Sequence, residues 1–201
     1  MKNFSKAGLL IVTLVIPALI FAYLNFFAKN HYILPYFFPS KDLQGNVIVQ
    51  NGDTLFRKIG SICPQLNGVG IDKRLTVVST LPASCDDHCQ AVLSQLERIV
   101  ALQKGIPQLG VLTITDKEPT LNGKLPDSMG KDGWKVIVQA KGLSDCLESE
   151  GNVQIGRDSR LVLIDNEGFV RGFYDGSIEA ETDRLMAEIK ILDYETKTSK
   201  K

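Results

Sequence analysis

The sequence has no excess of either charge. Its 201 residues include 23 Lys and Arg against 23 Asp and Glu, so the formal net charge is zero. Such a chain has no positive field with which to gather nucleic acid, and it has no basic stripe interleaved with aromatic residues. Repeats with a period of roughly 20 to 50 residues are also absent, as are low-complexity tracts. We therefore exclude nucleic-acid binding and repeat architectures.

One long apolar run lies near the N-terminus. Residues 7–27 are apolar except for Thr13 and Asn25, and this length matches the ~20 residues that a helix needs to cross a bilayer. A cleavable signal peptide would have a shorter apolar centre followed by small residues. Lys2 and Lys6 precede the run and favour a cytoplasmic N-terminus. We predict a single-pass inner-membrane protein whose soluble part faces the periplasm.

Composition divides the chain into four segments. We predict a cytoplasmic stub and transmembrane anchor at 1–28, a linker and N-terminal hairpin at 29–67, one folded domain at 68–195, and a disordered tail at 196–201. Aromatic residues close to the end of the anchor are typical of a membrane interface, and we interpret them as an interfacial belt. They are Tyr32, Tyr36, Phe37 and Phe38.

The folded segment alternates strand and helix patterns. Buried-strand patterns are expected at 75–81, 110–115 and 134–139, a hairpin at 160–174, and amphipathic helices at 86–103 and from Ser177 through Leu192. A strand, a helix and a neighbouring strand imply a right-handed parallel crossover. With the terminal hairpin and helix, this order predicts a thioredoxin-like three-layer α/β fold with a mixed central sheet and helices on both faces.

The chemistry of the chain centres on Cys85 and Cys89. They lie in the segment LPASCDDHCQ, where the first central strand gives way to a helix, and a spacing of four residues lets their sulfurs meet. A helix N-terminus favours a thiolate, the form that attacks disulfides and binds soft metals. Asp86 and Asp87 oppose a thiolate, whereas a protonated His88 would favour it. The pair is either a stabilising disulfide or buried thiols, or else a redox or metal site.

Two other features are open to more than one interpretation. His88 is either an ordinary exposed helix residue or a group that tunes or ligates the thiols. Cys63 and Cys146 are outside the Cys85 segment, and we weigh three states for them: a structural disulfide, two unpaired buried thiols, or a resolving role toward Cys85. A periplasmic location permits disulfides to persist.

The chain resembles the Sco/SenC family of membrane-tethered, thioredoxin-fold proteins of cytochrome oxidase assembly. Two stretches carry the resemblance: STLPASCDDHCQAVLSQLERI, and LVLIDNEGFVRGFYDGSIEAETDRLMAEI with its D-x-x-G turn and YDG run. The resemblance covers roughly residues 75–192. It implies a copper site made of both cysteines and a distal histidine, and a cytochrome oxidase subunit as the partner protein.

The sequence departs from that family at the third copper ligand. Arg157 stands at the position of the distal histidine, no histidine follows His88, and Gln90 replaces the proline that follows the second cysteine. A guanidinium cannot ligate a metal. Arg157 is either a group near Cys85 that stabilises a thiolate or a surface arginine paired with Asp158 or Glu167.

Three functions follow from these residues. The leading prediction is a thiol-disulfide redox protein of cytochrome c oxidase assembly acting through Cys85 and Cys89. The second is a copper chaperone without turnover that uses the two cysteines, with His88 as a further candidate ligand. The third is a redox-inactive assembly scaffold with a permanent disulfide.

Overall fold

We describe the chain from a computed structural model, which covers residues 13–23, 34–67, 71, 74–82, 84–115, 120–121, 127–131, 133–138, 146, 155 and 159–198. The chain forms two compact units, Met1–Ile33 and Leu34–Lys201. The first contains a helix at 13–23, within the predicted anchor. Among the described residues, no helix is both long enough and apolar enough to cross a bilayer. The remainder of the predicted span lies outside the described residues.

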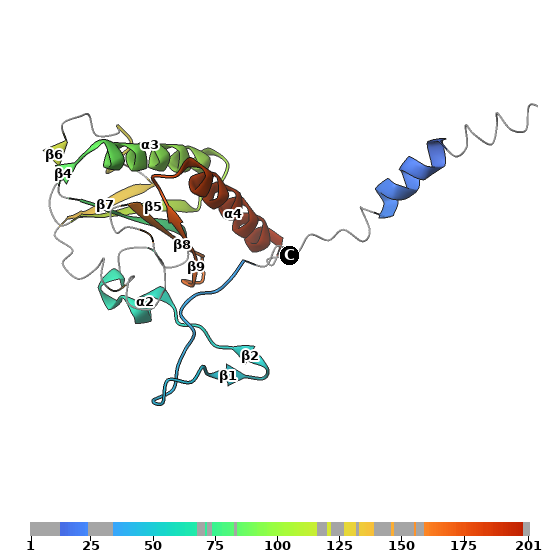
Figure 1. Cartoon of the computed structure of the whole chain (residues 1–201), viewed down its shortest axis with the longest axis horizontal. Helices are drawn as coiled ribbons and strands as arrows, with labels where there is room; N and C mark the ends of the chain where they lie inside the picture. The colour runs from blue at the N-terminus through green and yellow to red at the C-terminus, as the bar shows by residue number, and fades with distance from the viewer. Residues whose placement is uncertain are drawn as a thin grey trace, which may run out of the picture. The chain divides into compact units, whose positions relative to one another are not determined.

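The second unit is built on a five-stranded mixed sheet with the order β7-β5-β3-β8-β9 (Figure 1). The central strand β3 (Leu75–Leu81) pairs in parallel with β5 (Leu109–Thr115), which pairs in parallel with β7 (Trp134–Val138). On its other side β3 pairs antiparallel with β8 (Arg160–Ile164), which forms a hairpin with β9 (Val170–Asp175). The predicted succession of strands along the chain, the mixed central sheet and the thioredoxin-like α/β fold are confirmed.

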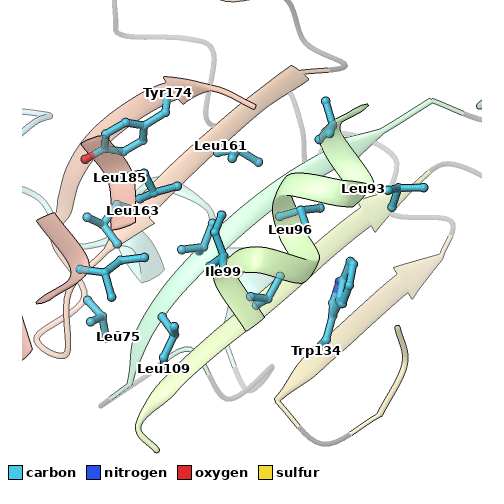
Figure 2. Close-up of a cluster of buried hydrophobic side chains, with 14 of the residues drawn as sticks. Leu75, Leu93, Leu96, Ile99, Leu109, Trp134, Leu161, Leu163, Tyr174 and Leu185 are labelled. Atoms are coloured by element: carbon cyan, nitrogen blue, oxygen red, sulfur yellow. The ribbon is translucent and has the colours of Figure 1, made fainter. Parts of the chain in front are cut away.

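Two long helices pack on one face of this sheet. They are α3 (Asp87–Ala101), continued by the short 3-10 helix η2 (Leu102–Lys104), and α4 (Glu179–Thr198). In Figure 2, Leu93, Leu96 and Ile99 of α3 point toward the strands, where Leu75, Leu109 and Leu163 meet them. This cluster is the larger of the two cores. Strand residues alternate between faces, so that Val77 enters this core and Val78 the other.

The opposite face is covered mainly by chain from the segment that we predicted to be a linker. The short helix α2 (Ile59–Ile62) and the 3-10 helix η1 (Pro64–Leu66) bring Ile59, Cys63 and Leu66 onto Val78, Leu112 and Val162. Residues 34–67 therefore belong to the same compact unit as the sheet. Helices therefore lie on both faces, as predicted, although the long helices α3 and α4 share one face and only the short α2 and η1 lie on the other.

The interfacial belt is wrong for Phe37 and Phe38, because they pack on the folded unit. Phe38 is 4% exposed, and Phe37 meets Phe173 edge to face at 5.1 Å between ring centroids. Tyr36 is 41% exposed and stacks on Phe56 at 5.2 Å, and its place in the belt stays a prediction. Tyr32 lies outside the described residues.

An apparent linker residue, Pro39, begins a small hairpin subdomain. The chain folds back twice: Lys41 pairs with Val47, β1 (Val49–Gln50) pairs with β2 (Asp53–Thr54), and Pro39 pairs with Phe56. This confirms the hairpin expected before residue 67. We call residues 39–56 the hairpin lobe.

The C-terminal helix extends further than we expected. It continues to Thr198, where we predicted a disordered tail from residue 196. The last turn is held by a hydrogen bond from the Thr196 hydroxyl to the Leu192 carbonyl and by an ion pair between Lys197 and Asp193 at 2.7 Å. A cation near a helix C-terminus is also favourable to the helix dipole.

Candidate redox site

Cys85 and Cys89 form a disulfide at the edge of the sheet where β3 ends. Cys85 belongs to β4 (Ser84–Cys85), which pairs in parallel with β6 (Thr120–Leu121), and Cys89 lies in the first turn of α3. Their Cα atoms are 5.1 Å apart, within the range that a disulfide requires. The structure therefore brings together the two residues that the sequence singled out.

Asp86 caps the helix that carries the second cysteine. Its backbone is extended, and its carboxylate accepts a hydrogen bond at 3.0 Å from the backbone N–H of Cys89. Acidic residues are preferred at this position because they satisfy an otherwise unpaired N–H group. Asp86 thus fixes the start of α3, and its negative charge lies beside the two sulfurs.

The two cysteines differ in burial. Both belong to the larger core, where Cys85 is 5% exposed and Cys89 is 1% exposed. Attack on a disulfide requires a path to the sulfur. The difference makes Cys85 the more accessible of the two, and it makes Cys89 the residue retained inside the protein.

His88 is exposed and turned away from the core, as is Asp87. Consecutive helix residues are separated by about 100°, so a side chain next to the buried Cys89 points elsewhere. His88 is nevertheless close enough for its charge to lower the pKa of Asp175, which ends β9.

Asp175 adds a polar group to this edge of the sheet. Its carboxylate accepts hydrogen bonds from the Ser177 hydroxyl at 2.6 Å and from the Ser177 backbone N–H at 2.9 Å. Burial acts to raise the pKa of Asp175, but the hydrogen bonds from Ser177 and Ser159 and the charge of His88 outweigh it and bring the pKa below its usual value. The group is an anion at neutral pH.

Asp175 lies on the cysteine edge for topological reasons. Strand β8 runs antiparallel to β3, and β9 runs antiparallel to β8, so β9 ends at the same edge as β3. Sequence reasoning noted Asp175 only within the YDG run and gave it no role. An acidic residue that ends a strand and precedes a helix was the available signal.

The second cysteine pair is also joined. Cys63 and Cys146 form a disulfide with a Cα separation of 5.5 Å across 83 positions of sequence. Cys63 is fully buried beneath the face opposite α3. Of the three states that we weighed for this pair, the structure has the first, a disulfide remote from the Cys85 pair in the fold.

The third ligand of a copper site is not found in the described part of the chain. No group of three or more His, Cys, Asp and Glu residues there is arranged to hold a metal ion. Arg157, which replaces the distal histidine, lies outside the described residues. The donors that the site presents are the two cysteines, which can supply two thiolates once they are reduced.

One cavity of about 300 Å³ lies at the other edge of the sheet, beside the turn at Asp165 and Asn166. Its charged walls include Arg171 and Asp165, which are already paired with each other at 3.0 Å. This cavity is separate from the cysteine site.

Comparisons with known proteins give a likeness in fold. No protein-family model matches the chain, and no curated protein matches it either. Among solved structures it is similar to a SCO1/SenC family lipoprotein from Bacillus anthracis str. Ames, with 13% sequence identity, a TM-score of 0.45, and coverage of 61% of this chain and 83% of that chain.

Two further similar structures have comparable scores. BsSco, a member of the Sco family of cytochrome c oxidase assembly proteins, has 14% identity and a TM-score of 0.42 over 63% of this chain and 84% of its own. A thioredoxin-like protein from Porphyromonas gingivalis has 16% identity and a TM-score of 0.42 over 81% of this chain and 92% of its own.

Proposed function

We propose that the chain is a membrane-anchored, Sco-like thiol-disulfide redox protein in which Cys85 and Cys89 cycle between dithiol and disulfide. The observation that carries the proposal is the Cys85–Cys89 disulfide at the start of α3. A helix N-terminus stabilises a thiolate, and α3 offers this to the cysteine that precedes it. The two stretches that resemble the Sco/SenC family support a role in assembling the copper centre of cytochrome c oxidase.

The reaction is a two-electron exchange in two steps. In the reduced protein the Cys85 thiolate attacks one sulfur of a partner disulfide, which forms a mixed disulfide and releases the other partner sulfur as a thiolate that takes up a proton. Cys89 then loses its proton and attacks the Cys85 sulfur. The second partner thiolate leaves, so the partner gains two electrons and two protons, and Cys85–Cys89 is oxidised.

The difference in burial supports this order of steps. The more accessible Cys85 meets the partner, and the more buried Cys89 attacks the Cys85 sulfur, with which it forms the disulfide. The negative charge of Asp86 disfavours a thiolate on either sulfur, whereas the dipole of α3 favours one, so the two effects oppose each other.

The test uses the reduced full chain and oxidised glutathione as the model disulfide. We expect one molecule of oxidised glutathione to yield two of glutathione and the Cys85–Cys89 disulfide. Cys85→Ser should abolish the exchange at this pair. Cys89→Ser should stop at a glutathione mixed disulfide on Cys85, which peptide mass mapping would detect.

The matched control is Cys63→Ser together with Cys146→Ser, which removes the other disulfide and leaves the proposed site intact. This variant should exchange at the wild-type rate if it is folded, as judged by circular dichroism. Exchange that survives in folded Cys85→Ser protein would refute the proposal. A Cys85–Cys89 disulfide that native protein never exchanges would instead favour a permanent disulfide in a scaffold protein.

Copper delivery is the second candidate, with Cu(I) as cargo. The short Cα separation of Cys85 and Cys89 favours it, because both thiolates can reach one ion and Cu(I) accepts two soft ligands. The test is anaerobic Cu(I) titration of reduced chain against a competing chelator. One-to-one binding that Cys85→Ser removes and His88→Gln retains would support a two-thiolate site.

A further inference from the structure

The hairpin lobe, residues 39–56, extends away from the five-stranded sheet (Figure 1). It carries five of the large apolar side chains that are exposed in the described part of the Leu34–Lys201 unit. They are Leu43, Val47, Ile48, Val49 and Leu55. Of the others, Tyr36 stacks on Phe56 of the lobe, whereas Val138, Ile178 and Tyr194 are far from one another in the sequence. Gathered apolar exposure, unlike scattered exposure, marks a binding surface.

Leu43 is the most exposed of these side chains, at 106% of its reference area. Hydrogen bonds within the turn hold Leu43 in this position. The Asp42 carboxylate accepts hydrogen bonds from the backbone N–H groups of Gln44 and Asn46, each at 2.9 Å, and from the Asn46 side chain at 3.2 Å. Gly45 closes the turn at a φ of 88°. The turn is thus well bonded, and it displays an apolar side chain to the solvent.

The lobe lies at the edge of the sheet opposite to the cysteines. Immediately after it, the Ile59 backbone N–H donates to the Gly168 carbonyl at 2.7 Å, and Lys58 pairs with Phe169. Gly168 and Phe169 belong to the turn between β8 and β9, which follows the end of β8. Because β8 is antiparallel to β3, this turn is at the edge where β3 begins, whereas Cys85 follows the end of β3.

We propose that the hairpin lobe docks on the bilayer that holds the N-terminal anchor of the same chain. This inference rests on the membrane anchor of the proposed function. The predicted span ends at residue 27 and the lobe begins at residue 39. The 11 residues between them (28–38) extend to at most about 40 Å, so the lobe stays near the membrane surface.

The charges of the lobe indicate which lipid it meets. Lys41, Asp42 and Asp53 sum to −1, from one positive and two negative charges. Burial of apolar side chains in the interface therefore drives the docking, because the lobe itself has no net positive charge that would attract anionic headgroups. A docked lobe holds the amino edge of the sheet toward the bilayer and directs the Cys85–Cys89 edge away from it, toward proteins in the aqueous space.

The experiment places a tryptophan at the tip of the lobe. Full-length Leu43→Trp protein is reconstituted in phosphatidylcholine vesicles whose acyl chains are brominated, which quench tryptophan at close range. Ile178→Trp is the matched control, because Ile178 is also exposed and precedes α4 at the cysteine edge. We expect the added emission of Leu43→Trp to shift to shorter wavelength and be largely quenched, and that of Ile178→Trp to remain.

The other outcomes separate this inference from the proposed function. Unquenched Leu43→Trp emission in protein that stays with the vesicles through an alkaline wash would overturn docking and leave the anchor standing. A shift without quenching that grows with protein density would assign the lobe to a second copy, also against docking. Protein lost in the wash would overturn anchor and docking together. Glutathione exchange by the same samples reports separately on folding and on the cysteine chemistry.

Val49→Trp provides a second probe on a different part of the lobe, since Val49 is 58% exposed. If the Leu43 turn alone were distorted by its substitution, Val49→Trp would still be quenched. Failure of both probes in exchange-competent protein overturns the proposal.

Discussion

Asp86 combines two effects that substitution can separate. Its carboxylate caps α3, and its charge lies next to the cysteines. We expect Asp86→Ala to lower the free energy of unfolding by about 1 kcal/mol, because the Cys89 N–H loses its acceptor. Asp86→Asn keeps an acceptor and should cost only a few tenths of a kcal/mol. Urea denaturation of the oxidised proteins measures both. Equal losses in the two variants would contradict the capping role.

The contribution of Asp175 to the free energy of unfolding should change with pH in a defined direction. Its pKa in the folded protein is lowered, so its contribution is complete above the unfolded pKa of about 3.9 and is lost as the pH falls through the lower folded value. The stability difference between wild type and Asp175→Asn should therefore be largest near pH 7 and shrink below about pH 4. Urea midpoints across this range test it, and a difference that grows in acid would show the sign to be wrong.

Single residues were predicted unevenly. Cys85 and Cys89 could be identified from the sequence because their spacing alone brings two sulfurs together at a helix start. The last helix was expected to begin at Ser177, but α4 begins at Glu179, and the Ser177 hydroxyl donates to Asp175. A serine near a helix start has several local partners, and the sequence does not rank them.

At the scale of elements, the β8–β9 hairpin depends on a buried ion pair. Arg171 and Asp165 meet at 3.0 Å with side chains 5% and 6% exposed, and Arg171 also donates to the carbonyls of Leu34 and Pro35. Arg171→Met leaves a buried carboxylate unpaired, and we expect it to cost about 3 to 5 kcal/mol. Adding Asp165→Asn removes that charge but keeps an acceptor for the turn, so the double variant should recover part of the loss.

The control for this prediction is Arg98→Met. Arg98 pairs with Asp183 at 2.8 Å between α3 and α4, but its side chain is 39% exposed. An exposed pair contributes about 1 kcal/mol or less. Thermal and urea unfolding of all three variants provide the comparison. A loss of stability in Arg171→Met no larger than that in Arg98→Met would show that burial does not increase the contribution of an ion pair to stability.

Strands were predicted better than their surroundings. The pattern LTVVSTL reproduces β3 at Leu75–Leu81, because a central strand is buried on both faces and has no polar interruption. Phe37 and Phe38 were misinterpreted. An aromatic residue has the same side chain whether it lies at a membrane interface or against Phe173, and only tertiary packing distinguishes the two environments.

At the scale of the whole molecule, the two disulfides should contribute very different amounts to stability. Cys63–Cys146 spans 83 positions and Cys85–Cys89 spans 4. The chain-entropy estimate gives about 4.5 kcal/mol for the first and about 2 kcal/mol for the second. We expect Cys63→Ser with Cys146→Ser to lower the unfolding free energy well below that of Cys85→Ser with Cys89→Ser. Equilibrium denaturation under oxidising conditions decides between them, and the reverse order would refute the estimate.

The pairing of Cys63 with Cys146 shows why long-range contacts could not be predicted from the sequence. Nothing local to SICPQL or to Cys146 points to the other, and the pairing follows only once α2 is placed against the sheet. The thioredoxin-like order could be predicted because neighbouring elements in the chain are neighbours in space. Residues 34–67 could not be assigned to the unit in this way, since they return to β8 and β9, which come much later in the chain.

The span of the Cys63–Cys146 bond also affects how proteolytic cleavage of the chain would be detected. It encloses β3, α3, β5 and β7, together with the reactive pair. A protease that cuts once anywhere inside this loop leaves two fragments still joined by a covalent bond. Such nicked protein keeps the mass of the intact chain, apart from one added water, until a reductant separates the halves, so cleavage within the redox unit is invisible on a gel run without thiol.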